Sequence, residues 1–138
     1  GTAVWITDGN SKLLKLDAAG AILQTVTIGV ESRYPVFDGS NIWVPNKGNN
    51  SVTVVRASSG VVLQTLTGNG LSNPWAAAFD GERVIVASAF DTVSLWKAGN
   101  LSELGSIGTG VGTTPNGACS DGANFWITFY GTGKLARF

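Results

Sequence analysis

Short runs of apolar residues, each followed by a glycine-containing turn, recur along the whole chain. Runs such as 52–55 and 84–87 are apolar at nearly every position, whereas a strand with one face in water alternates apolar and polar residues. Strands that are apolar on both sides are buried on both faces. No apolar spacing typical of a helix is sustained, and glycine is frequent. The pattern predicts an all-β chain whose sheets are stacked face to face.

The same unit is repeated with a nearly constant period. Asp-Gly pairs begin at Asp38, Asp80 and Asp121, which are 42 and 41 residues apart (38 to 80, and 80 to 121). Trp5, Trp43, Ile85 and Trp126 hold one position of the repeat, and the three tryptophans are expected in the core. A period of about 41 residues built from short strands and turns indicates four-stranded antiparallel β-propeller blades. A two-sheet sandwich, the alternative, does not repeat one turn pattern at this period.

The period divides residues 1–138 into a single partial propeller domain of about 3.5 blades. Each blade has strands A (innermost) to D (outermost). The predicted blades span about 1–29 (without strand A), 33–68, 75–108 and 116–138 (without strand D). Pro35 lies inside the predicted A strand at 34–37, which requires an edge strand, because proline cannot donate a ladder hydrogen bond.

The last blade carries the fullest motif: Pro115, Gly117-Ala118, Asp121-Gly122 and Asn124-Phe125-Trp126-Ile127-Thr128. With its sister copies it resembles bacterial seven-bladed propellers of the YVTN/NHL/SMP-30-like group, including the virginiamycin B lyase family. The resemblance implies the fold and leaves function open, because such propellers serve as lectin-like, scaffolding, lyase and lactonase proteins.

About 3.5 blades are too few to close a ring, since propellers have about four to eight. An open arc exposes apolar sheet faces and unpaired edges. The favoured prediction is a homodimer that completes a ring of six or eight blades. The alternative is a segment of a longer, seven-bladed chain, with which the absence of methionine is compatible.

The composition limits the classes of partner that this protein can bind. The formal net charge is +0 and only 13% of residues are charged, without the basic face that nucleic-acid binding needs. No apolar run is long enough for a membrane span. The loops rich in Thr, Ser, Asn and Gly, together with the low charge, favour an extracellular or periplasmic location.

Catalytic chemistry is restricted by the absence of histidine. Ser-His-Asp and Cys-His catalysis and all histidine-containing metal sites are thereby excluded. Cys119, the only cysteine, lies in an apolar strand pattern and is expected to be a buried small hydrophobe. Asp38, Asp80 and Asp121 each precede a turn glycine and are expected to serve the turns.

The candidate site lies at the mouth of the central channel, where the D-to-A and B-to-C loops meet. Amide and carboxylate oxygens there suit sugar hydroxyls, and aromatic rings cover apolar C–H faces. An alternative is that Asn, Asp and Gly are present because turns need them. The candidate ligand-binding residues are Asp8, Glu31, Arg33, Asn46, Lys47, Trp75, Asp91 and Tyr130.

The sequence favours a non-enzymatic binding module for carbohydrate or protein. Whether the protein is an enzyme is left open, because a metal-dependent lactonase or lyase could use loop carboxylates. No cofactor is expected, although loop carbonyls and Asp suit Ca²⁺ as an alternative.

Overall fold

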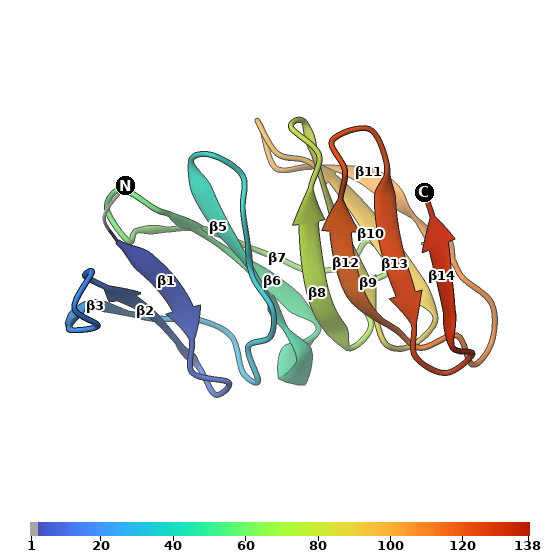
Figure 1. The fold of residues 1–138 in the computed structure, drawn as a ribbon, viewed down its shortest axis with the longest axis horizontal. Helices are drawn as coiled ribbons and strands as arrows, with labels where there is room; N and C mark the ends of the chain where they lie inside the picture. Colours follow the sequence, from blue (N-terminus) through green and yellow to red (C-terminus); the bar gives the residue numbers. More distant parts are fainter. Residues whose placement is uncertain (1–2) are drawn as a thin grey trace.

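The computed structural model describes residues 3–138 and is built from antiparallel sheets that follow one another along the chain (Figure 1). We call these four sheets blades 1 to 4, in chain order. The strands are β1 (Val4–Thr7), β2 (Lys12–Leu16) and β3 (Ile22–Thr27) in blade 1; β4 (Val36–Phe37), β5 (Asn41–Asn46), β6 (Ser51–Arg56) and β7 (Val62–Leu66) in blade 2; β8 (Pro74–Phe79), β9 (Arg83–Ser88), β10 (Thr92–Lys97) and β11 (Ser102–Gly108) in blade 3; and β12 (Pro115–Ser120), β13 (Phe125–Phe129) and β14 (Lys134–Arg137) in blade 4. The prediction of an all-β partial propeller is confirmed.

Each blade is a simple meander in which neighbouring strands are also neighbours in sequence. The only helical segment among the described residues is a single 3-10 turn, η1 (Lys47–Asn49). Within residues 3–138, no helix has the length and apolarity needed to cross a bilayer.

The core consists of three apolar layers, one between each pair of successive blades. Trp43 and Val54 of blade 2 pack against Val84 and Trp96 of blade 3. The layer between blades 1 and 2 is built around Leu13, and the layer between blades 3 and 4 around Phe125 and its neighbours. A blade with neighbours on both sides is therefore apolar on both faces, which explains the non-alternating strands.

Three residues expected in the core are not fully buried. Cys119 is exposed, and Trp126 is half-buried, whereas Trp43 is fully buried. Cys119 pairs with Trp126 across β12 and β13, so both side chains lie on one face of blade 4. Among residues 3–138, no further blade covers that face. Trp5 is likewise only half-buried.

The innermost strand of blade 2 is shorter than predicted, because β4 contains only Val36 and Phe37. Pro35 has no N–H for the ladder. Before it, Tyr34 leaves the blade and forms a parallel bridge to Ala76 of blade 3. Its N–H donates to the Trp75 carbonyl (3.1 Å), so the inner strands of blades 2 and 3 are joined by backbone.

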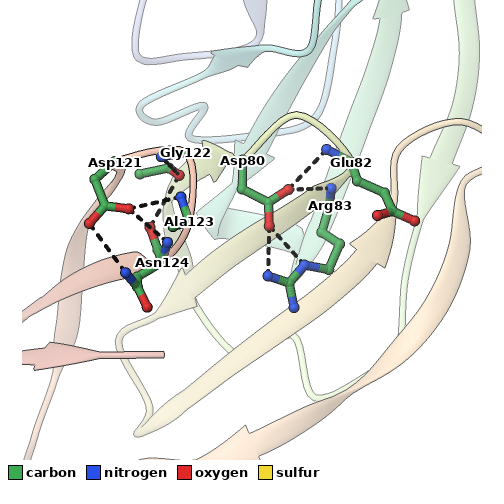
Figure 2. A network of polar contacts seen from close by, with 8 residues as sticks. Asp80, Glu82, Arg83, Asp121, Gly122, Ala123 and Asn124 are labelled. Carbon is green, nitrogen blue, oxygen red and sulfur yellow. Dashed lines mark hydrogen bonds and ion pairs between the residues drawn. The ribbon is translucent and has the colours of Figure 1, made fainter.

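The A-to-B turns lie at one end of the blades, which we call the turn end. Asp121 Oδ1 accepts the N–H groups of Ala123 and Asn124, and its other oxygen accepts the indole N–H of Trp126 at 2.8 Å. Asp38 makes the same bonds, including one from Trp43 Nε1 at 2.7 Å. In the third blade, where isoleucine replaces tryptophan, Arg83 occupies the second oxygen of Asp80 (Figure 2).

These turns explain why the three aspartates do not form a reactive carboxylate ring. The Trp126 indole and then the backbone N–H groups of Asn124 and Ala123 hold the pKa of Asp121 well below its usual value. Burial raises the pKa of Asp80, but hydrogen bonds from Arg83 and Glu82 outweigh it, so the net pKa is lowered. These bonds favour the charged form of Asp80 and Asp121, and all three carboxylates, that of Asp38 included, accept hydrogen bonds within their own turns.

Candidate functional site

The opposite end, which we call the mouth end, is formed by the D-to-A and B-to-C loops. One backbone hydrogen bond recurs there in three blades. The N–H groups of Lys47, Ala89 and Tyr130 donate to the carbonyls of Glu31, Asn73 and Thr114, at 3.1, 2.9 and 3.1 Å. Each bond fixes a B-to-C loop on the D-to-A loop that enters the same blade.

The three acceptor residues share an unusual backbone conformation. Glu31, Asn73 and Thr114 have φ values of 53°, 61° and 48°. This left-handed region is costly for residues other than glycine, and a β-branched residue such as Thr114 is a genuine outlier there. Equivalent positions of three blades thus share a left-handed backbone, which is most strained at Thr114 and is maintained by the surrounding hydrogen bonds.

Trp75 is the centre of a charged cluster. The guanidinium carbon of Arg33 lies 4.6 Å from the centroid of the Trp75 ring, and Lys47 Nζ lies 5.5 Å from it. Both cations also approach Glu31 Oε2, at 3.6 Å for Arg33 and 3.2 Å for Lys47. Two cations with one carboxylate leave this cluster one positive charge in excess, and attraction of a cation to the ring face stabilises the arrangement.

A small hollow of about 320 Å³ adjoins Trp75. It is lined by Trp75 and Ala89 of blade 3 and by Thr114, Asn116 and Tyr130 on the blade 4 side. Tyr130 is largely exposed, and the Asn116 amide oxygen accepts a hydrogen bond from Thr128 Oγ1 at 2.9 Å. Two aromatic rings, an amide and a hydroxyl thus meet around one open space.

Four of the predicted site residues are therefore brought together around one ring: Trp75 contacts Arg33 and Lys47, and these two contact Glu31. Tyr130 joins Trp75 through the hollow. These five residues come from the loops and strand ends of three blades, so only the assembled fold forms the cluster.

The structure places Asp91 in a structural role at the mouth end. Its carboxylate accepts the N–H groups of Thr114 (2.9 Å) and Gly112 (2.8 Å), and the Thr113 hydroxyl at 3.1 Å. The bonds from Thr114 and then Gly112 hold the pKa of Asp91 below its usual value. Asp91 thereby fixes the loop that carries Thr114 beside the hollow.

The two remaining predicted residues lie apart from Trp75. Asn46 is fully buried, and its amide donates to Ser51 Oγ (3.0 Å) and Thr53 Oγ1 (2.9 Å) inside blade 2. Asp8 lies in the first B-to-C turn, where its Oδ1 accepts the N–H groups of Asn10 and Lys12. Both side chains have bonding partners within their own blades.

Sequence reasoning did not single out Asn116 and Thr114. The signal is in the repeat: Arg33, Trp75 and Asn116 each lie five residues before a turn aspartate (38 − 33, 80 − 75 and 121 − 116). Glu31, Asn73 and Thr114 each lie seven residues before it (38 − 31, 80 − 73 and 121 − 114). Counting back from each aspartate therefore identifies the mouth positions of all three blades.

A wider depression of about 1570 Å³ lies toward the turn end and is lined by residues of blades 1 to 3. Its size does not make it the better candidate. The polar groups along it belong largely to turns, and the Asp38 carboxylate already accepts four hydrogen bonds, from Ser40, Trp43 and both the backbone and the side chain of Asn41. The smaller hollow offers a mainly apolar surface from two blades, with the aromatic rings of Trp75 and Tyr130 in its lining.

Metal-binding residues do not gather at either end. Over residues 3–138, no three Asp, Glu or Cys side chains lie close enough together to hold one ion. The carboxylate of the Trp75 cluster belongs to Glu31, which is paired with two cations.

No protein-family model and no curated protein matches this sequence. Solved structures do resemble it. The chain is 17% identical to a chain of Kuenenia stuttgartiensis hydrazine synthase, with a TM-score of 0.85, covering 100% of this chain and 43% of that one. It is 17% identical to the computationally designed Ika4 protein, with a TM-score of 0.84, covering 100% and 85%.

It is also 14% identical to virginiamycin B lyase of Staphylococcus aureus, a β-propeller, with a TM-score of 0.83, covering 98% of this chain and 47% of that one. The chain thus spans less than half the length of the hydrazine synthase and lyase chains that it matches. At these identities the likeness establishes a propeller-like fold and carries no information about activity.

Proposed function

We propose that this protein is a non-enzymatic propeller module that binds carbohydrate at the mouth end. The observation that carries the proposal is the hollow between blades 3 and 4, where Trp75 and Tyr130 meet Asn116 and Thr114. Aromatic rings pack on the apolar C–H faces of sugars, and amide and hydroxyl groups bond their hydroxyls. Arg33, Lys47 and Glu31 are expected to orient a polar substituent beside Trp75.

The strained backbone supports the same location. Residues held in sparsely populated conformations cluster at binding sites, where the surrounding structure maintains them. Glu31, Asn73 and Thr114 keep side chains at left-handed positions that glycine would fill without strain. We infer that these positions carry side chains because the side chains take part in binding at the mouth end.

The proposal is tested by glycan-array screening of the 138-residue chain, followed by calorimetry with the best oligosaccharide. Trp75→Ala is expected to weaken binding by about tenfold, because an aromatic contact contributes up to about 1.5 kcal/mol and 1.4 kcal/mol is a factor of ten. Phe37→Ala, which removes an exposed aromatic ring of β4 away from the hollow, should leave affinity unchanged. Equal weakening by both variants, or binding to no glycan, refutes the proposal.

Repeating the measurement with chelator separates this function from the metal-dependent lactonase or lyase alternative. Binding that survives chelator supports the module, whereas metal-dependent turnover of lactones supports the alternative. A protein ligand remains the second kind of partner that we expect for the same mouth.

We further propose that the repeats belong to the YVTN/NHL/SMP-30-like group, that the protein acts outside the cytoplasm, and that a second copy completes the ring. The last of these proposals is developed next.

A further inference from the structure

The outermost faces of blades 1 and 4 are apolar and uncovered by the rest of the described chain. On blade 4, pairing across β12, β13 and β14 places Cys119, Trp126, Thr128, Leu135 and Arg137 on one face, which we call the C-terminal face. On blade 1, Val4, Ile6, Leu14, Leu16 and Ile22 share what we call the N-terminal face. Leu135 is 60% exposed, and Val4 and Ile6 are 57% and 40% exposed.

The C-terminal face repeats a face that is already used inside the chain. In blade 4, Trp126 pairs with Arg137 and Thr128 with Leu135. In blade 1, Trp5 pairs with Lys15 and Thr7 with Leu13 in the same arrangement. That face of blade 1 packs on blade 2, where Leu13 is completely buried. Leu135 is thus the exposed equivalent of a core residue.

The N-terminal face repeats the other half of the same contact. Val4 pairs with Leu16 as Ile42 pairs with Val55, and Ile6 takes the place of Val44. Ile42, Val44 and Val55 are the blade 2 residues that cover Leu13. They are 5%, 0% and 0% exposed.

We propose that the C-terminal face of one copy packs on the N-terminal face of a second copy, and that two such contacts close a ring of eight blades. Each chain carries both halves of its own blade 1–blade 2 interface, so a second copy fits by the packing that the fold already uses. A head-to-tail contact either closes or extends into filaments. With two copies of four blades, both terminal faces are covered. This inference specifies the interface of the homodimer proposed above.

The 138-residue chain should therefore have twice its 14.3 kDa mass by native mass spectrometry and light scattering at micromolar concentration. Leu135→Glu and Ile6→Glu should each lower dimer affinity at least a hundredfold, because a charge would be buried without a partner. Both residues are exposed within the single chain, so unchanged circular dichroism will show that the variants still fold. Val61→Glu, at a position 56% exposed but on neither terminal face, should remain dimeric.

A mixing experiment separates head-to-tail packing from a contact between like faces. Ile6→Lys and Leu135→Glu should each be monomeric alone. Mixed in equal amounts, they should form a heterodimer with one unaltered interface and one in which lysine faces glutamate. If like faces paired instead, one of the two variants would stay dimeric alone.

Cys119 reports on the same interface, because it is exposed on the C-terminal face and is the only cysteine. Its alkylation should be at least tenfold slower in the dimer than in Leu135→Glu. A monomeric parent chain, a dimer unaffected by Leu135→Glu, or open filaments would overturn the proposal. None of these readouts involves sugar binding, so failure of the carbohydrate proposal leaves them unchanged, and a monomer that binds sugar refutes only the ring.

Discussion

The turn end and the mouth end each have an equivalent position that is left-handed in three blades, but they fill it differently. At the turn end, the residue directly after the aspartate is always glycine: Gly39, Gly81 and Gly122 have φ values of 96°, 105° and 90°. At the mouth end, the residue seven positions before that aspartate is Glu31, Asn73 or Thr114, although other left-handed positions of the same loops, such as Gly70 and Gly112, are glycine.

The difference distinguishes positions that build the fold from positions whose side chains vary between blades. The turn end needs only a backbone geometry, and the aspartate before each glycine satisfies the exposed N–H groups in the same way in all three blades. At the mouth end, equivalent positions carry Arg33, Trp75 and Asn116, which differ in charge, size and hydrogen bonding. A repeated scaffold thus holds a non-repeated set of side chains, as a binding surface requires.

The largest effect on stability is expected from a core residue that is anchored to the turn end. Trp43→Ala should lower the free energy of unfolding by about 3–5 kcal/mol, because it empties a fully buried site. Urea denaturation at fixed protein concentration measures the loss. Trp75→Ala, at the mouth, should cost clearly less, since part of that ring already lies in water. Equal losses would remove the distinction between a structural end and the proposed binding end.

The next effect concerns the turn carboxylates. Asp38→Ala leaves the buried indole N–H of Trp43 without its acceptor, and an unsatisfied buried donor costs about 1–3 kcal/mol. Asp8→Ala, in a mouth-end turn, should cost less than about 1 kcal/mol, because water can reach the N–H groups of Asn10 and Lys12. The two urea transitions, compared with the parent, measure the difference. A larger loss for Asp8→Ala would contradict this assignment.

The architecture could be predicted from the sequence because its causes are local and repeated. The Asp-Gly turns and the strands that are apolar on both sides recur at a nearly constant period, so each blade supports the interpretation of the others. The same reasoning was wrong for Cys119, because a strand pattern does not reveal whether a neighbouring blade exists. A residue on a terminal face is buried only if another blade packs on that face. The apolar pattern of the strand is the same in either case.

The site could be predicted only in part. Loop composition led to Trp75, Arg33 and Lys47, but it also led to Asn46, which the fold turns inward between strands. Asparagine suits a mouth loop and a buried hydrogen-bond network equally well. Contacts such as Arg33 with Trp75 join different blades, and no local pattern specifies their distance.

Exchanging the residue types of the two ends tests the comparison within one blade. Gly122→Thr should cost about 1–2 kcal/mol, since its added Cβ meets no neighbouring atom and only the left-handed φ is unfavourable. Thr114→Gly should instead stabilise the chain by up to about 1 kcal/mol, by removing that strain, although the more flexible unfolded chain offsets part of the gain. Thermal and urea unfolding will measure both. Destabilisation by Thr114→Gly would mean that its side chain holds the loop.

The smallest effect on stability per residue is expected when pH is lowered. Asp91 and Asp121 both have pKa values held below the ordinary 3.8 by hydrogen bonds that need the charged form. As pH falls, the unfolded chain therefore takes up these protons first. The stabilising contribution is complete above the unfolded pKa and is lost as pH falls through the folded values. Each effect is limited, because a protonated carboxyl still accepts hydrogen bonds and both groups are exposed to water.

The urea midpoint should accordingly fall progressively as pH drops below about 5, and each aspartate should account for part of the fall. Asp121→Asn and Asp91→Asn should each be less stable than the parent at neutral pH but should lose less on acidification, because asparagine takes up no proton. A midpoint for Asp91→Asn that falls as steeply as that of the parent would show that Asp91 does not stabilise the mouth loop through its charge. Asp91 would then again be a candidate ligand-binding carboxylate beside Thr114. Aspartate would stabilise turns at the turn end but would be available for a ligand at the mouth end.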